Sequence, residues 1–464
     1  MTVGLAHRPK QLIELPARVL VGAMRAGELR AIEVVEAFLR RITQREPSLR
    51  AWAWLNPDQA LEAAARADAA KDAGKPLGPL HGLPIGVKDI IDTFDMPTEC
   101  GTPIRKGRRP EADAIVVARL RAAGAVILGK SVTAEFAFHA PGPTRNPHDP
   151  TRTPGGSSSG SAAAVADGMA PAALATQTNG SVIRPAAFCG VVGYKPSLGL
   201  LPRTGILKQA ALLDQPGVIA RDVADAALIV ETMTGRDPAD EFSYDPSATG
   251  LLEAALADCP APKLAFVRGP FWDRADLEAR RAIEAFASGI GTPIETVDLP
   301  QDFAAAEDAL AVILCCGVAH AYRDDFERGG SMMSDSLQRA IERGRSLSAS
   351  DFFRACAVRD QLRKLYDVVT ARYDAIVTLA APGAAPPFAE GTGNPIFSTI
   401  WTLVGAPAIT LPLLRSGANL PIGVQLVGRF KDDAGLLTTA AWLERSHGGL
   451  AQSGQYGEFG ARHA

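Results

Sequence analysis

Between residues 11 and 72, apolar side chains recur every three or four positions along the chain. Ile32, Val35, Leu39 and Ile42 follow this spacing with charged residues between them, which predicts an amphipathic helix. Pro47 is expected to end that helix, because proline lacks a backbone donor and clashes with the preceding turn. Helices are also predicted over 11–24 and over about 56–71, and together the three predict a helical cover over about 11–72.

From residue 80 onward the pattern changes to short apolar runs separated by helical stretches. The run from Leu83 to Ile91 predicts a buried strand, and it contains a lysine, Lys88. Strands recur up to residue 427 without a repeat or a linker, so we expect one large α/β domain. Further strands are predicted at 126–128, 264–267, 375–379, 408–413 and 422–427. Further helices are predicted at 112–123, 224–233, 276–287, 303–343 with a break at 329–330, 351–372 and 433–445.

Two Gly/Ser turns lie between Pro154 and Pro196. The first is GGSSSGS at 155–161, and the second is NGS at 179–181. Residues 162–175 between them are apolar but small, which predicts a segment that packs its backbone close to other backbone. The preceding residues, 141–156, are rich in proline and polar side chains and are expected to form a loop.

The composition is that of a soluble globular protein, with 47% hydrophobic and 21% charged residues. A net charge of −3 excludes a strongly basic nucleic-acid-binding protein. The six cysteines form no CxxC pair and no zinc-type Cys/His cluster, so we expect no metal site. No signal peptide and no run of about 18 apolar residues is present, which favours a reducing, cytoplasmic setting and no membrane span.

The first turn matches the G-x-S-x-G nucleophile elbow of α/β-hydrolases, with Ser158 at its centre. That motif normally follows a strand, whereas 151–154 is a Thr/Pro loop, so an esterase using Ser158 is the less favoured interpretation. His320 and His447 follow in the chain and keep a Ser158 triad open. A phosphate-binding P-loop is excluded, because Ser161 stands where that motif requires lysine.

Lys88 has two interpretations. Burial lowers the pKa of an amine, so a neutral Lys88 can act as a base. Alternatively, its ammonium group reaches water or pairs with Asp89 or Asp92. Most histidines lie near the termini or in Gly/Pro loops, so lysine is a reasonable partner for a nucleophilic serine.

The turn that contains Ser181 can aim successive backbone N–H groups at one point and so bind an oxyanion. Arg184 follows three residues later. Its guanidinium group either holds a substrate carboxylate through several donors or forms a structural salt bridge.

Together these residues resemble the amidase signature family of serine hydrolases. The resemblance rests on HGLPIGVKD at 81–89, PGGSSSGS at 154–161 and GSVIRPAAFCG at 180–190, with weaker agreement over 214–227 and 401–425. It implies a mixed, twisted β-sheet covered by helices on both faces. On this interpretation a catalytic core covers about 80–235, and a region over about 260–445 forms the pocket and completes the sheet.

The resemblance also implies a Ser–cisSer–Lys triad. Ser181 would be the nucleophile of an acyl-enzyme mechanism, and Ser157, following a cis peptide bond, would pass the proton of Ser181 to neutral Lys88. No metal or cofactor would take part. The oxyanion would be held by the backbone N–H groups of Thr178, Asn179, Gly180 and Ser181.

Two positions depart from the commoner family pattern, since many members have aspartate at Gln177 and glycine at Asn179. Gln177 together with Arg184 is similar to the malonamidase and biuret-hydrolase branch, in which the arginine holds a substrate carboxylate. We therefore expect an amidohydrolase that cleaves a small polar or carboxylated amide, or a biuret-like ureide, and releases ammonia or amine. The expected substrate-binding residues are Arg184, Thr176, Gln177 and Ser158.

Three alternatives stay open. One is a glutaminase-type component of an amidotransferase complex, although such components usually carry the aspartate that is absent at Gln177. The others are the Ser158 esterase and a non-catalytic binding protein with the same fold. The expected partners are a small amide and, because family members are often dimers, a second copy of the chain or, alternatively, a small accessory subunit. Nucleic acid and membrane are not expected partners.

Overall fold

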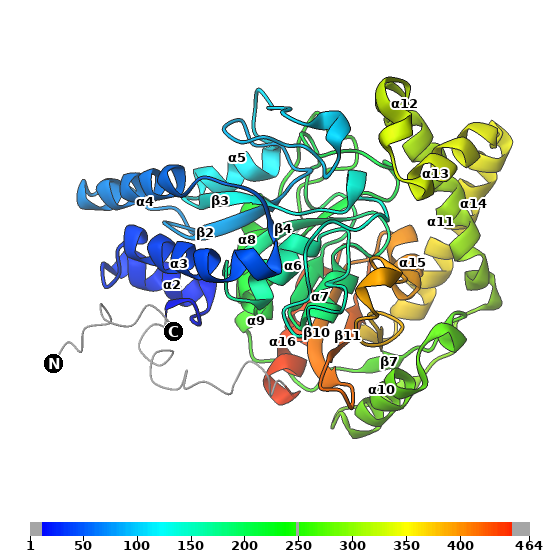
Figure 1. Ribbon diagram of the computed structural model, residues 1–464. Coiled ribbons are helices and arrows are strands. Elements are labelled where there is room, and N and C mark those ends of the chain that lie inside the picture. The colour runs from blue at the N-terminus through cyan, green and yellow to red at the C-terminus, as the bar shows by residue number, and fades with distance from the viewer. Residues whose placement is uncertain (1–11, 247–249, 448–464) are drawn as a thin grey trace.

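The computed structural model describes residues 12–246 and 250–447 (Figure 1). Eleven strands form one sheet in the order β1-β3-β2-β4-β6-β5-β10-β11-β9-β7-β8. The strands are β1 (Trp52–Leu55), β2 (Pro84–Lys88), β3 (Val126–Ser131), β4 (Ala172–Gln177), β5 (Val192–Lys195), β6 (Gln215–Ala220), β7 (Leu264–Phe266), β8 (Ile294–Thr296), β9 (Ala375–Leu379), β10 (Ala408–Arg415) and β11 (Pro421–Val427).

The sheet is mixed. Strand β2 pairs in parallel with β3 and β4, and β7 pairs in parallel with β8 and β9. The remaining pairs, including those of the central strands β6, β5, β10 and β11, are antiparallel. The chain is therefore one large α/β domain, as its alternating pattern predicts.

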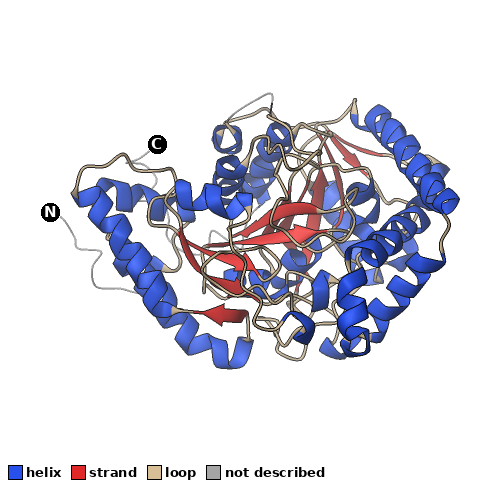
Figure 2. Ribbon diagram, turned by 90° about the horizontal axis from the view of Figure 1, so that it is seen from above, coloured by secondary structure: helices blue, strands red, loops and turns tan. Residues whose placement is uncertain are grey.

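Helices lie on both sides of this sheet (Figure 2). They are α2 (Ala17–Ala26), α3 (Ala31–Leu49), α4 (Pro57–Asp72), α5 (Ile115–Ala122), α6 (Ser159–Ala166), α7 (Ile183–Cys189), α8 (Val223–Met233), α9 (Leu251–Leu256), α10 (Leu277–Gly289), α11 (Ala306–Ala321), α12 (Arg323–Gly329), α13 (Asp335–Ser346), α14 (Ala349–Thr370), α15 (Ile396–Leu403) and α16 (Asp433–His447).

Side-chain alternation along β5 shows how the two faces are covered. A Cβ atom on Gly193 would lie 2.5 Å from the Cβ atom of Ala186, so glycine lets α7 approach the sheet closely on that face. The next residue, Tyr194, points to the other face, where its hydroxyl donates to Asp433 of α16 at 2.6 Å. The central strands are thus enclosed by α7 on one side and α16 on the other.

Helix α11 and the short 3-10 helix before it, Gln301–Ala321, are long and apolar enough to span a membrane by composition alone, with a mean hydropathy of 1.6. The helix packs against α13, α14 and α15. Its buried residues include Leu310, Ile313 and Val318, so part of its apolar surface is covered within the domain.

Several predicted elements differ from the observed ones. Pro47 does not end α3 but lies in its last turn, and the helix continues to Leu49. The small-residue segment 162–175 divides into the end of α6 and most of β4, and its close packing begins at Gly160, where a Cβ atom would lie 2.2 Å from the carbonyl oxygen of Ala51. The predictions omit β1, β5, β6, β8, α7, α9 and α15, and they treat α6 and β4 as one segment. Most of these elements are short or lack a clear start signal.

Candidate active site

The site forms where β2 and β4 end. These two strands are parallel neighbours, so their carboxyl ends lie at the same edge of the sheet. Lys88 is the last residue of β2, and Gln177 is the last residue of β4. The turn before α6, which contains Ser157, and the turn before α7, which contains Ser181, lie at this edge.

Lys88 is fully buried, and its contacts are hydroxyl and carbonyl oxygens. Its Nζ atom lies 2.7 Å from Ser157 Oγ and 2.8 Å from Thr176 Oγ1. Burial lowers the pKa of Lys88 well below its ordinary value, against the opposing effect of the Asp214 carboxylate. The amine is thus held next to a serine hydroxyl under conditions that favour its neutral form.

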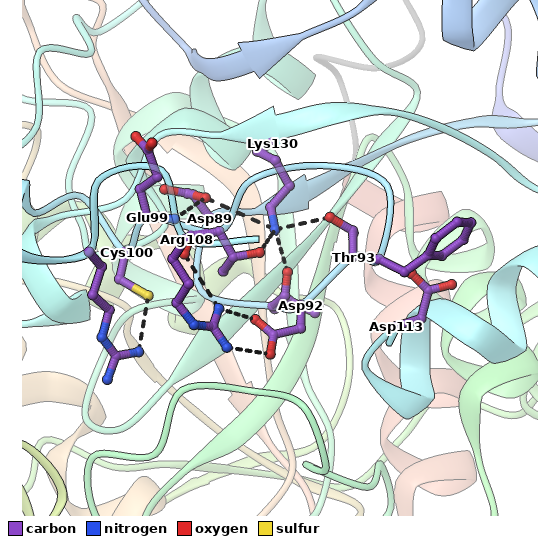
Figure 3. Close-up of polar contacts among 12 residues, drawn as sticks. Asp89, Asp92, Thr93, Glu99, Cys100, Arg108, Asp113 and Lys130 are labelled. Atoms are coloured by element: carbon purple, nitrogen blue, oxygen red, sulfur yellow. Dashed lines mark hydrogen bonds and ion pairs between the residues drawn. The ribbon is translucent and has the colours of Figure 1, made fainter. Parts of the chain in front are cut away.

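The alternative partners of Lys88 are engaged elsewhere (Figure 3). A second buried lysine, Lys130, lies 4.0 Å from the Asp89 carboxylate and donates to Thr98 Oγ1 at 2.6 Å. Asp92 forms a bidentate pair with Arg108. Lys130 therefore contacts the loop that follows β2, and Lys88 contacts Ser157.

Ser157 and Ser158 have different surroundings. The peptide bond between Gly156 and Ser157 is cis. Ser157 Oγ accepts the hydrogen bond from Lys88, whereas Ser158 Oγ donates to the carbonyl oxygen of Thr176 at 3.3 Å and is fully buried. Within 12–246 and 250–447, no histidine forms a hydrogen bond with Ser158, so the Ser158 esterase lacks a base in this geometry.

Ser181 lies at the start of α7, with 8% of its surface exposed. Across the described ranges, the N–H groups of Asn179, Gly180 and Ser181 have no protein acceptor, so this turn offers backbone donors to a ligand. Ser181 Oγ has no hydrogen-bond partner in the same ranges, so no hydrogen bond between Ser157 and Ser181 is observed.

Gln177 faces away from the donors of this turn. Its Oε1 atom accepts from the N–H groups of Val182 and Ile183 at 2.8 and 3.1 Å. Its Nε2 atom donates to Thr402 Oγ1 at 2.9 Å. Every polar atom of this buried amide thus has a protein partner.

Arg184 links the two serine turns. Its Nη2 atom donates to the carbonyl oxygen of Gly156 at 2.6 Å, and its Nη1 atom donates to that of Gly393 at 2.7 Å. Burial lowers the pKa of this guanidinium group to about 9, which leaves it protonated at neutral pH. Within the described residues no carboxylate pairs with it, and its Nε atom has no partner. Arg184 is thus a buried cation without a counter-ion in the described part of the chain.

Asp214 contacts the turn that contains Ser181 through the side chain of Thr178. It accepts from Thr178 Oγ1 at 2.7 Å and from the N–H groups of Gln209 and Ala210. Burial raises the pKa of this carboxyl group to about 6. A cavity of about 140 Å³ is lined by Thr176, Thr178 and Asp214, with further lining residues between 203 and 216.

Lys88, Ser157 and Arg184 are predicted from the sequence as site residues, but other residues around them are not. Helix α15 presents Thr399 and Thr402 to the turn, where they donate to Asn179 Oδ1 and to the Asn179 carbonyl oxygen. Threonine one helical turn apart in an apolar helix was a faint signal. Across the described ranges, no group of three His, Cys, Asp or Glu side chains could hold a metal ion.

Comparison with known proteins identifies the family. The Amidase family model matches residues 33–437. A glutamyl-tRNA(Gln) amidotransferase subunit from Chloroflexus aurantiacus is 35% identical, covering 94% of this chain and 97% of that protein. The corresponding protein from Anaeromyxobacter sp. strain K is also 35% identical, covering 95% and 98%.

Solved structures agree in fold. Native peptide amidase from Stenotrophomonas maltophilia superposes with a TM-score of 0.82 and 30% identity, covering 94% of this chain and 97% of that one. A structure described as a vestigial protein complex that reveals the evolutionary origins of an s-triazine catabolic enzyme gives a TM-score of 0.86 and 28% identity, covering 93% and 98%. The chain belongs to the amidase signature family and is a hydrolase that acts on C–N bonds.

Proposed function

We propose that this enzyme is an amidohydrolase that cleaves a small, polar amide carrying a carboxylate, through an acyl-enzyme on Ser181. The observation that carries the reaction is the 2.7 Å contact between Lys88 Nζ and Ser157 Oγ. A neutral amine at this distance can accept the hydroxyl proton, which prepares Ser157 to take a proton from Ser181.

The steps follow from this arrangement. Ser181 Oγ attacks the amide carbonyl carbon, and its proton passes through Ser157 to Lys88. The negative oxygen is held by the N–H groups of the Ser181 turn that have no acceptor in the described chain. Ser157 returns the proton to the leaving nitrogen as the C–N bond breaks. Water then attacks the acyl-enzyme and gives its proton to the same relay, which releases the acid and restores Ser181.

The uncompensated charge of Arg184 supports a carboxylated substrate. A buried charge is costly unless it is paired, and no carboxylate in the described part of the chain pairs with Arg184. Three of its five N–H groups bind Gly156, Thr392 and Gly393, so two donors remain for a ligand. This charge favours the acidic substrates of the malonamidase branch.

Paired substrates test this proposal. Malonamic acid and malonamide have the same size and differ in carrying a carboxylate or a second amide. Ammonia release should be faster with malonamic acid, and Ser181→Ala should abolish it. Arg184→Leu also disturbs Gly156, so it should slow both substrates, but the preference for the acid should disappear. A preference that survives this substitution would exclude Arg184 as the carboxylate site.

The names of the curated relatives favour a second candidate function. Both relatives described above are named as amidotransferase subunits. In that role the chain would hydrolyse glutamine only when joined to partner chains. Glutaminase activity can be measured for the isolated chain and for the chain mixed with the other components of such a complex. Activity that appears only in the mixture supports the second candidate function.

A further inference from the structure

Helix α15 holds the nucleophile turn through a short chain of hydrogen bonds. Thr402 Oγ1 donates to the carbonyl oxygen of Asn179 at 2.5 Å and accepts from Gln177 Nε2 at 2.9 Å. One turn earlier on the same face, Thr399 Oγ1 donates to Asn179 Oδ1 at 3.0 Å. All of these side chains are buried except that of Asn179.

The helix also packs closely against the backbone of this turn. A Cβ atom on Gly180 would lie 2.9 Å from Pro395 Cβ and 3.3 Å from Ser398 Oγ. The backbone of Gly180 is therefore in direct contact with the first turn of α15. Helix α15 therefore holds the residues before Ser181 both by packing against Gly180 and by hydrogen bonds to Asn179.

The bond to the Asn179 carbonyl oxygen has a consequence for the neighbouring donor. The Asn179 carbonyl and the Gly180 N–H belong to one planar, trans peptide unit, in which C=O and N–H point in opposite directions. Because Thr402 fixes the oxygen toward α15, it turns the Gly180 N–H away from α15. That N–H has no acceptor in the described chain.

We propose that Thr402 is a positioning residue that orients the Gly180 N–H as an oxyanion donor, and that Gln177 sets the direction of the Thr402 hydroxyl. This inference rests on the proposed function, because it assumes that the Ser181 turn binds the oxyanion. It deepens that function by assigning roles to Gln177 and Thr402 outside the substrate pocket.

The direction of the hydroxyl follows from proton counting. Thr402 has one hydroxyl proton and gives it to Asn179, so its oxygen must accept a hydrogen bond from Gln177. An amide at 177 supplies that proton. An ionised carboxylate has none, and it would draw the Thr402 proton away from Asn179. Gln177 and Thr402 therefore form a matched pair.

Labelling by a fluorophosphonate measures this effect without knowledge of the substrate, because the phosphonyl oxygen takes the place of the oxyanion. We expect Thr402→Val to slow the second-order labelling rate of Ser181 by about tenfold to a hundredfold, since loss of one oxyanion donor reduces turnover by about 10²–10³. Thr402→Ser keeps the hydroxyl and should label like wild type. Thr439→Val, at a buried threonine on α16, is the matched control and should also label like wild type.

Gln177→Glu gives an independent readout with an unchanged shape. The labelling rate of Ser181 in this variant, divided by the wild-type rate at the same pH, should be low at neutral pH. It should recover as pH falls, because a protonated carboxyl group can again donate to Thr402. If the wild type is labelled at Ser181, and Thr402→Val melts at the wild-type temperature and is labelled at the wild-type rate, the inference about Thr402 is wrong and the proposed function stands. No labelling of Ser181 in the wild type would instead overturn the proposed function.

Discussion

The Nζ atom of Lys88 lies 2.7 Å from Ser157 Oγ, and within 12–246 and 250–447 no carboxylate forms an ion pair with it, while Asp89 and Asp92 contact Lys130 and Arg108. Lys88→Met should lower kcat by about 10²–10⁴, the range of a general base. Steady-state turnover and the melting temperature measure this. Lys130→Met is the control: it should lower the melting temperature while the folded protein keeps its labelling at Ser181. Wild-type turnover by the Lys88 variant at neutral pH would exclude it as the base.

The charge of Asp214 should be visible in the pH profile. The proposed mechanism needs neutral Lys88, so kcat/KM should rise with pH through the lowered pKa of Lys88. Burial lowers that pKa most, Asp214 and Cys100 raise it, and Arg184 lowers it. Asp214→Asn removes an opposing charge, so the pKa of Lys88 should fall further and the acidic limb of kcat/KM should move to lower pH. A limb that stays in place or moves to higher pH would contradict this electrostatic link.

Two glycines offer opposite stability tests. A Cβ atom at Gly160 would lie 2.2 Å from the Ala51 carbonyl oxygen and 2.4 Å from Val132 N, so Gly160→Ala should destabilise the fold by about 3 kcal/mol or more. Gly22 in α2 has no atom within 4 Å of such a Cβ atom. Gly22→Ala should therefore stabilise the protein by about 0.5–1 kcal/mol. Urea unfolding of both variants checks the pair, and equal effects would show that Gly160 is not packed against Ala51 and Val132 as described.

The strands around the candidate site are predicted in part, because their apolar patterns are local. The strand predicted at 83–91 is observed as β2 over 84–88, so Lys88 lies at its end and not inside it. Strand β9 is predicted at its observed bounds, 375–379. The contact between Lys88 and Ser157, 69 positions apart, required the resemblance to a family rather than periodicity.

The parts that could not be predicted depend on contacts between distant segments. Gln177 is expected to contact the substrate because it departs from the commoner family pattern, and the sequence gives no sign that its amide bonds to Val182 and Thr402. Helix α15 follows a Pro/Gly loop and has no side-chain cap, so its sequence shows no start signal. Its first turn packs against Gly180, more than 200 positions earlier in the chain, and periodicity does not describe such a contact.

The central claim is that Ser181 is the nucleophile and that Ser157 relays its proton. The direct measurement is fluorophosphonate labelling of the folded enzyme, followed by identification of the modified peptide. We expect one label on Ser181, much slower labelling in Ser157→Ala, and none in Ser181→Ala. A label on Ser158, or a folded wild-type protein that takes up no label, would contradict the account.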